Sequence, residues 1–127
     1  MKVVAVIGAS RDPDKFGNKA VRAFRRQGFH VIPVNPNLAA AGHTIEGLSV
    51  YASVSDVPGT IDLATLYVPP EVGEQVVPEL AEKNIHELWV NPGAESRALV
   101  ALAESLGLST TLHCSIVAIG ESPADYE

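Results

Sequence analysis

The feature that most constrains how this chain folds is an apolar run near its start that ends abruptly at a glycine. Residues 2–8 include Val-Val-Ala-Val-Ile-Gly, and an apolar run without alternation predicts a strand buried on both faces. A helical pattern over 17–27 and a second apolar run over 29–34 follow it. Because the crossover in such a unit is right-handed, we expect the two strands to be parallel.

The rest of the chain repeats this alternation. Three more strands and two more helices are predicted, with strands over 61–68, 86–90 and 108–112 and helices over 72–81 and 98–106. Pro78 stands inside the first of these helices, where a proline removes a hydrogen bond, so we expect a kink or a late helix start. The pattern predicts one α/β domain over residues 1–127, a Rossmann-like, doubly wound and mostly parallel sheet of about five strands with helices on both faces.

Three stretches give weaker patterns. Residues 37–60 have no clear periodicity, although 39–43 look like a loop or short helical turn and 48–51 like a small strand or a packed loop. Residues 115–119 are apolar and are expected to run on as a tail against the sheet. Residues 120–127 are polar, so we expect them to fray.

Charge and cysteine content narrow the class of protein. Nine Lys and Arg against fifteen Asp and Glu give a net charge of −6, which argues against nucleic acid or an anionic membrane as a partner. Cys114 is the one cysteine, so no intrachain disulfide can form and a reducing compartment is expected. The strand pattern begins almost at residue 1 and no apolar run approaches about 18 residues. We therefore expect a cytoplasmic protein with neither a signal peptide nor a membrane span.

Small residues and cations gather at the end of the first strand. In open α/β sheets ligands bind beyond the carboxyl ends of the strands, near the point where strand order reverses. There, Gly8 permits a tight turn, Ala9 and Ser10 let a ligand approach the backbone, and Arg11 and Lys15 supply positive charge. This turn leads into a helix, which predicts a phosphate-binding site.

A dinucleotide is the obvious ligand to consider, but two residues argue against it. Ser10 stands where the G-x-G-x-x-G fingerprint has its second glycine. At the end of the second strand, where an acidic side chain usually grips the cofactor ribose, the chain has Asn35 followed by Pro36. Asn35 retains the ability to hydrogen-bond a ribose or an adenine edge, so NAD is disfavoured and not excluded.

Four short segments, in this order along the chain, resemble the CoA-binding domain family. They are Gly8-Ala9-Ser10-Arg11, Lys15-Phe16-Gly17, Val34-Asn35-Pro36 and Tyr67-Val68-Pro69-Pro70. The resemblance runs from Val3 to about Ile119. The family includes small stand-alone proteins and is similar to the N-terminal domain of the succinyl-CoA synthetase alpha subunit. The resemblance implies that the ligand is coenzyme A, free or acylated.

The same resemblance implies a role for each matching residue. The CoA phosphates would be held by the first turn, with Lys15, Phe16 and Gly17 completing the binding set downstream. Adenosine would be bordered by Val34, Asn35 and Pro36, and the path of the pantetheine arm would be lined by Val68, Pro69, Pro70, Val90, Asn91 and Pro92. Two segments depart from the family: Asn37 stands where relatives often have a lysine, and Asn91-Pro92-Gly93 differs from the commoner small-protein version.

No group of residues suggests catalysis. His113 and Cys114 are adjacent, and neighbours on an extended chain point to opposite faces, so the cysteine is expected to be a buried residue closing the last strand. His30 and His86 stand at the starts of predicted strands, away from the ligand edge, whereas His43 lies in the unclear loop and could reach a ligand. The four histidines and one cysteine have no metal-ligand spacing.

Three functions remain open from the sequence. The first is a non-catalytic module that binds CoA or an acyl-CoA as a carrier, a sensor or the partner of an enzyme, with a homodimer as an open alternative. The second is an NAD(P)-binding enzyme or redox sensor. The third is a non-binding subunit of a larger acyl-CoA synthetase-like assembly.

Overall fold

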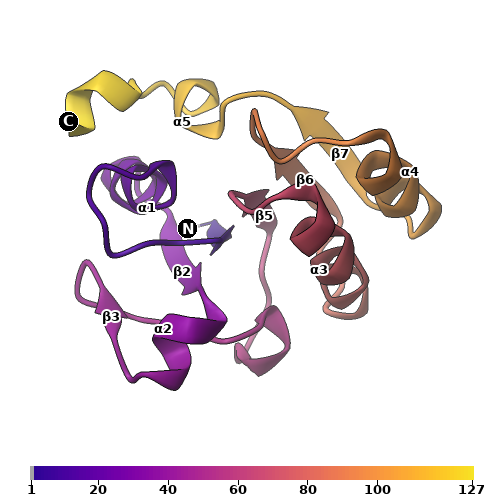
Figure 1. Ribbon diagram of the computed structural model, residues 1–127, viewed down its shortest axis with the longest axis horizontal. Helices are drawn as coiled ribbons and strands as arrows, with labels where there is room; N and C mark the ends of the chain where they lie inside the picture. The colour runs from indigo at the N-terminus through magenta and orange to yellow at the C-terminus, as the bar shows by residue number, and fades with distance from the viewer. Residues whose placement is uncertain (1) are drawn as a thin grey trace.

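The centre of the molecule is a five-stranded sheet (Figure 1). In this computed structural model, which describes residues 2–127, every neighbouring pair of strands in that sheet is parallel. In spatial order the strands are β2 (His30–Val34), β1 (Val3–Ile7), β5 (Leu63–Leu66), β6 (Glu87–Val90) and β7 (Ser109–Leu112). The predicted α/β doubly wound fold is confirmed.

Helices cover both faces of the sheet, as Figure 1 shows. One face carries α1 (Phe16–Arg26), α5 (Ser115–Ala118) and the short 3₁₀ helix η2 (Pro123–Tyr126), and the other carries α3 (Pro70–Glu82) and α4 (Arg97–Ser105). The strands supply both cores because alternate side chains point to opposite faces. Val4 and Val6 of β1 pack in the α1 core, and Ala5 and Ile7 pack in the α3 and α4 core. No helix within residues 2–127 is long and apolar enough to span a membrane.

The stretch after β2, unclear from the sequence, contains four short elements: α2 (Pro36–Ala40), an antiparallel pair of β3 (Thr44–Ile45) and β4 (Leu48–Ser49), and the 3₁₀ helix η1 (Val54–Asp56). The expected short helical turn is therefore present, and it begins earlier, at Pro36. Asn35 explains why, since its Oδ1 accepts a hydrogen bond of 3.1 Å from the N–H of Leu38 and caps the helix.

Pro78 does not delay its helix. The helix α3 begins at Pro70 and continues through Pro78 to Glu82, so a late start is wrong. Pro70 occupies the first turn, where its missing N–H costs nothing. Pro78 itself is exposed, while Val77 and Leu80 beside it are fully buried and hold the helix on the sheet.

The C-terminal segment is ordered, so the expectation that it frays is wrong. Residues 115–119 pack through Ser115 and Ile116, which are fully buried, and they form a helix instead of an extended tail, with Val117 59% exposed. In η2, Tyr126 is only 9% exposed, and its hydroxyl donates a hydrogen bond of 2.6 Å to Glu121. Arg22 of α1 donates a hydrogen bond of 3.0 Å to the carbonyl oxygen of Tyr126. The Tyr126 ring and the Arg22 hydrogen bond therefore attach the segment to α1, and the hydrogen bond to Glu121 holds Tyr126 within the segment.

Candidate ligand-binding groove

The sheet order sets where a ligand can enter. β1 lies between β2 and β5, so the chain passes from β1 to one side and later returns on the other side. Ligands of open α/β sheets bind outside the carboxyl ends of the strands at such a reversal. Gly8 directly follows β1 and Tyr67 directly follows β5, so these two residues mark the expected position.

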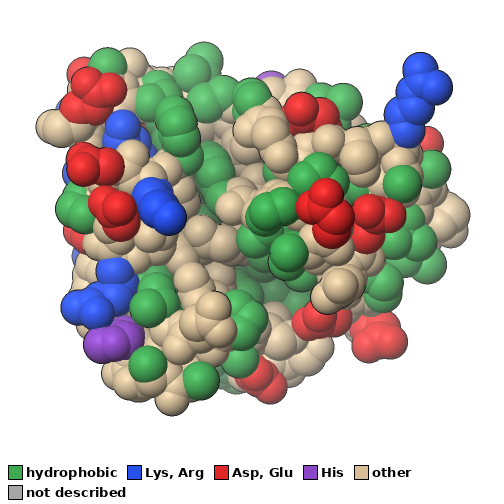
Figure 2. All heavy atoms as spheres, viewed as in Figure 1, with side chains coloured by type: hydrophobic (Ala, Val, Ile, Leu, Met, Phe, Trp, Pro, Cys, Tyr) green, Lys and Arg blue, Asp and Glu red, His purple; other side chains and the backbone are tan. Residues whose placement is uncertain are grey.

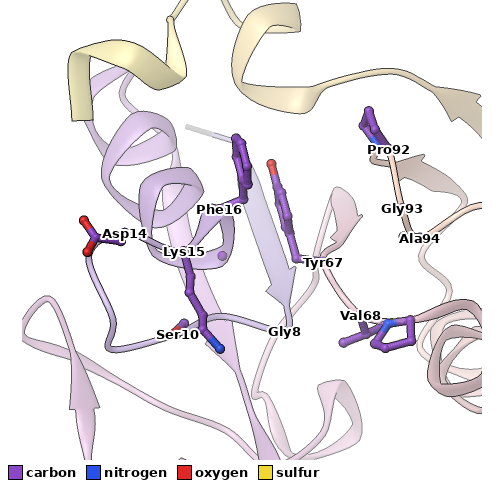
Figure 3. Close-up of a pocket in the computed structure, with 12 residues that line it drawn as sticks. Gly8, Ser10, Asp14, Lys15, Phe16, Tyr67, Val68, Pro92, Gly93 and Ala94 are labelled. Atoms are coloured by element: carbon purple, nitrogen blue, oxygen red, sulfur yellow. The ribbon is translucent and has the colours of Figure 1, made fainter. Parts of the chain in front are cut away.

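A cavity of about 530 Å³ lies at this position, between the N-terminus of α1 and the segments that follow β5 and β6 (Figure 3). We call it the central cavity. Its lining includes Gly8, Ser10, Lys15, Phe16, Tyr67 and Pro92. Figure 2 shows the molecular face viewed as in Figure 1: most of its Lys and Arg side chains lie on the left, interspersed with Asp and Glu, further Asp and Glu lie on the right, and the surface between is hollowed.

Two further cavities adjoin the central cavity. The β2-side cavity, of about 350 Å³, shares Gly8 and Val68 with it. The C-terminal cavity, of about 280 Å³, shares Phe16, Tyr67 and Pro92 with it. The three cavities therefore follow one another along the carboxyl edge of the sheet and form one groove.

Two glycines let α1 begin this close to the sheet. Gly8 has φ +89°, and a Cβ atom there would lie 2.5 Å from the carbonyl oxygen of Tyr67. Gly17 is in α1, and a Cβ atom there would lie 2.3 Å from the carbonyl oxygen of Gly8. A side chain at either position would push the first turn, the start of α1 or the end of β5 out of place.

Several residues that line the central cavity at the first turn and the start of α1 have backbone N–H groups without partners. Gly8 and Ala9 both donate to the carbonyl oxygen of Val34, at 3.0 and 3.3 Å, so their N–H groups are already used. Within residues 2–127, the N–H groups of Ser10, Phe16 and Gly17 have no hydrogen-bond acceptor. No side chain caps α1 and no acidic residue occurs in its first turn. Helix N-termini of this kind bind anions.

Side chains add to this anion site. The Oγ of Ser10 accepts a hydrogen bond of 3.0 Å from the N–H of Asp12, which leaves the hydroxyl hydrogen available to donate. Lys15 is exposed and has no carboxylate within ion-pair distance in the described part of the chain. In Figure 3 the Lys15 side chain extends over Ser10, whereas the carboxylate of Asp14 points away from the cavity. Lys15 is therefore the cation of the cavity lining, and Asp14, the acidic residue of that lining, is turned away from it.

Arg11 lies farther out than the sequence suggested. Its Nη1 is 3.1 Å from Nδ1 of His43, and neither residue lines any of the three cavities. Both side chains are exposed. His43 thus sits at the same end of the sheet as the phosphate turn, on its outer rim beside Arg11.

Asn35 and Asn91 act as internal ties between segments. Asn35 Nδ2 donates a hydrogen bond of 2.9 Å to the carbonyl oxygen of Ala9, while its Oδ1 caps α2. Asn91 is 3% exposed, donates to Thr65 and Leu66 and accepts from the N–H of Ser115. Asn35 also lines the β2-side cavity and Asn91 the C-terminal cavity, so both side chains border the groove while they hold its segments together.

The other site residues expected from the sequence divide between the groove and the core. Val34 and Pro36 line the β2-side cavity, Val68 lines both it and the central cavity, and Pro69 lines the central cavity. Ala9 is fully buried and Val90 is 1% exposed, so both lie beneath the groove surface. Pro70 starts α3.

Several lining residues escaped the sequence reasoning. One side of α3 faces the β2-side cavity with Val72, Gln75, Val76 and Glu79, and the Ser53 hydroxyl donates to the Glu79 carboxylate. Their spacing of three or four residues could have identified them, because it places them on one face of the helix that follows β5. Cys114 and Pro123 line the C-terminal cavity, and no local signal marks them because the C-terminal chain folds back from a distance.

Tyr67 carries an unusual polar group. Its hydroxyl is buried and has no hydrogen-bond partner within residues 2–127. Burial raises the pKa of this phenol well above its ordinary value, with a smaller contribution from Cys114, while the nearby Thr65 and Ser115 hydroxyls act in the opposite direction; the hydroxyl therefore stays protonated. In the same part of the chain, no three His, Cys, Asp or Glu side chains converge to hold a metal ion.

Comparisons with known proteins identify the family of this chain. A model described as a CoA binding domain matches residues 2–120. An acetate–CoA ligase (ADP-forming) II subunit alpha from Pyrococcus furiosus is 37% identical over 83 residues, which is 65% of this chain and 17% of that protein. The chain thus spans less than a fifth of the length of this curated relative.

Solved structures give the same picture at the level of the fold. A conserved hypothetical protein from Pyrococcus furiosus superposes with a TM-score of 0.84 at 38% identity, over 93% of this chain and 99% of that one. A dinucleotide-forming acetyl-coenzyme A synthetase 1 from Ca. Korarchaeum cryptofilum, in complex with phosphate and ADP, superposes with a TM-score of 0.73 at 31% identity, over 86% of this chain and 25% of that one. The domain therefore occurs both as a small protein and within larger ones.

Proposed function

Because this chain belongs to the CoA-binding domain family, we propose that it binds coenzyme A or an acyl-CoA along the groove at the carboxyl edge of its sheet. The pyrophosphate lies in the central cavity, against the N-terminus of α1 and Lys15. Adenosine lies in the β2-side cavity, between Pro36 and the valines of α3. Pantetheine passes Phe16, Tyr67 and Pro92 toward the C-terminal cavity.

The observation that carries this proposal is the order of the cavities. An anion site with three free N–H groups and an unpaired lysine lies between two cavities with largely apolar walls. Coenzyme A has the same order, with charged phosphates between an aromatic base and a mostly apolar arm. The groove therefore matches the whole ligand, not the phosphates alone.

The protein holds this ligand without transforming it. The groove lining brings together no nucleophile, base and orienting group within hydrogen-bond reach of one another. Its relatives include subunits of acetate–CoA ligases, so presentation of the ligand to a partner enzyme is the role we favour. If the protein is instead a non-binding subunit of a larger assembly, neither CoA nor an acyl-CoA should give a binding signal.

Isothermal calorimetry tests the proposal with CoA, acetyl-CoA, ADP, NAD and NADP in parallel. We expect CoA and acetyl-CoA to bind more tightly than ADP, because only they reach past Phe16 and Tyr67. NAD and NADP should bind more weakly, since Asn35 stands where a dinucleotide site has an acidic partner for the ribose and carries no charge. Binding of NAD without any binding of CoA would refute the proposal and favour the redox alternative.

A further inference from the structure

We propose that the C-terminal cavity is an acyl chamber, in which the Tyr67 hydroxyl donates a hydrogen bond to the thioester carbonyl oxygen of a short-chain acyl-CoA. This inference rests on the proposed function and makes it more specific. It names a thioester with a small apolar acyl group as the preferred form of the ligand, and Tyr67 as the residue that distinguishes this form from free CoA.

The chamber is placed where the far end of the pantetheine arm would arrive. It continues the central cavity past Phe16, Tyr67 and Pro92, and it ends against Cys114 and Pro123. In Figure 3 the Tyr67 side chain points away from Ser10 and Lys15, toward the C-terminal segment. A ligand whose phosphates sit at Lys15 therefore meets the Tyr67 hydroxyl only with its opposite end.

The chamber walls suit an apolar group. Phe16, Pro92 and Pro123 present carbon surfaces, and the Asn91 side chain that contributes to the wall has its amide engaged by Thr65, Leu66 and Ser115. A volume of about 280 Å³ is slightly below the ~300 Å³ at which small-molecule pockets begin. A short acyl group fits these dimensions and a long fatty acyl chain does not.

Among the described residues that line the chamber, Tyr67 is the one with a buried side-chain polar atom that has no hydrogen-bond partner. A buried donor without an acceptor is costly, and native structures rarely keep one without a reason. Its raised pKa keeps the proton on the oxygen at neutral pH, so the group can donate. A thioester carbonyl is a good acceptor, whereas the sulfur of a free thiol is a weak one. The unpaired phenol therefore favours acyl-CoA over CoA.

The test is a calorimetric comparison of butyryl-CoA with CoA, in reducing buffer, on the wild type and on Tyr67→Phe. In the wild type we expect butyryl-CoA to bind about 3- to 10-fold more tightly, the value of one net hydrogen bond. In Tyr67→Phe the ratio of the two dissociation constants should fall toward one. Tyr51→Phe is the matched control, because Tyr51 lies outside the three cavities, and it should keep the wild-type ratio.

A second variant tests the chamber without touching Tyr67. Cys114→Phe fills the far wall and should lower the affinity for butyryl-CoA more than the affinity for CoA, with folding checked by thermal unfolding. Palmitoyl-CoA should gain nothing over CoA in the wild type. If CoA binds but the ratio is near one, or survives in Tyr67→Phe, the acyl chamber is refuted and the CoA site stands. If neither CoA nor butyryl-CoA binds, the proposed function itself fails.

Discussion

Gly8 is the residue on which the geometry of the groove most directly depends. Its φ of +89° suits glycine, and the carbonyl oxygen of Tyr67 occupies the space that a Cβ atom would need. Gly28 is a natural comparison, because it has φ +87° and nothing within 4 Å of its Cβ position. Alanine at Gly28 therefore introduces backbone strain alone, whereas alanine at Gly8 adds a steric overlap.

We predict that Gly28→Ala lowers the free energy of unfolding by about 1–2 kcal/mol, the cost of the left-handed backbone for alanine. Gly8→Ala should lower it by about 1–3 kcal/mol more, because it adds a steric overlap at the end of β5. Urea unfolding of both variants measures the difference. Equal losses would mean that Tyr67 and Val68 move aside without cost.

Lys15 is the residue that tests the electrostatics of the site. It has no carboxylate partner in the described chain, so a bound phosphate would be its counter-ion. We predict that Lys15→Gln weakens CoA binding about 2- to 5-fold, as expected for an exposed ion pair, and that added salt reduces the difference. Arg97→Gln on α4, outside the groove, makes the same change in net charge and should leave the affinity unchanged. An equal effect of both variants would point to net charge alone.

At the scale of elements, two short motifs that resemble ligand-binding motifs also hold secondary-structure elements together. Asn35-Pro36 resembles a ligand motif, yet the asparagine caps α2 and ties it to Ala9, and the proline occupies the first helical turn. Asn91 likewise ties β6 to β5 and to the start of α5. These residues hold the segments of the groove together and also line its cavities, Asn35 on the β2 side and Asn91 at the C-terminal end.

The C-terminal segment also depends on a few polar contacts. Glu121 accepts a hydrogen bond from Tyr126, contacts Gln27, and lies 3.9 Å from the Arg26 guanidinium. The Tyr126 hydrogen bond is the main cause that lowers the pKa of Glu121 below its ordinary 4.5, with the Gln27 and Arg26 contacts acting in the same direction. A carboxylate whose pKa is lowered in the folded state contributes stability above its unfolded pKa and loses it as the pH falls.

We predict that the melting temperature falls between pH 5 and pH 3 and that part of this fall is absent in Glu121→Gln. Below the folded-state pKa the wild-type carboxyl is protonated, so the two proteins should converge there. Thermal unfolding at a series of pH values measures this. Glu104→Gln on α4 is a control, because Glu104 is exposed and its side chain has no hydrogen bond or ion pair within residues 2–127, and its pH profile should follow the wild type. Parallel profiles for Glu121→Gln and the wild type would contradict the assignment.

At the scale of the whole molecule, the groove is built from segments distant in sequence, so a ligand there should stabilise the entire fold. We predict that CoA at about 100 times its dissociation constant adds about 2.7 kcal/mol to the unfolding free energy. This corresponds to a melting temperature roughly 8–12 °C higher for a domain of this size. Lys15→Gln at the same CoA concentration should show a smaller rise. A rise that is equal for ADP would limit the contact to the nucleotide end.

The sequence by itself determined the elements and their order, because apolar periodicity and breakers act over a few residues. Five strands, the helices between them and the glycines of the first turn follow from such local patterns, as does the carboxyl edge as the place for a ligand. Tertiary structure alone decided which side chains line the groove at this edge. Asn35 and Asn91 were diverted into internal hydrogen bonds, Arg11 was drawn to His43, and the fold of the C-terminal chain brought Cys114 and Pro123 beside Tyr67. The reason is physical: a polar side chain bonds to whatever partner the packed chain places within reach, and those partners lie up to tens of residues away in sequence.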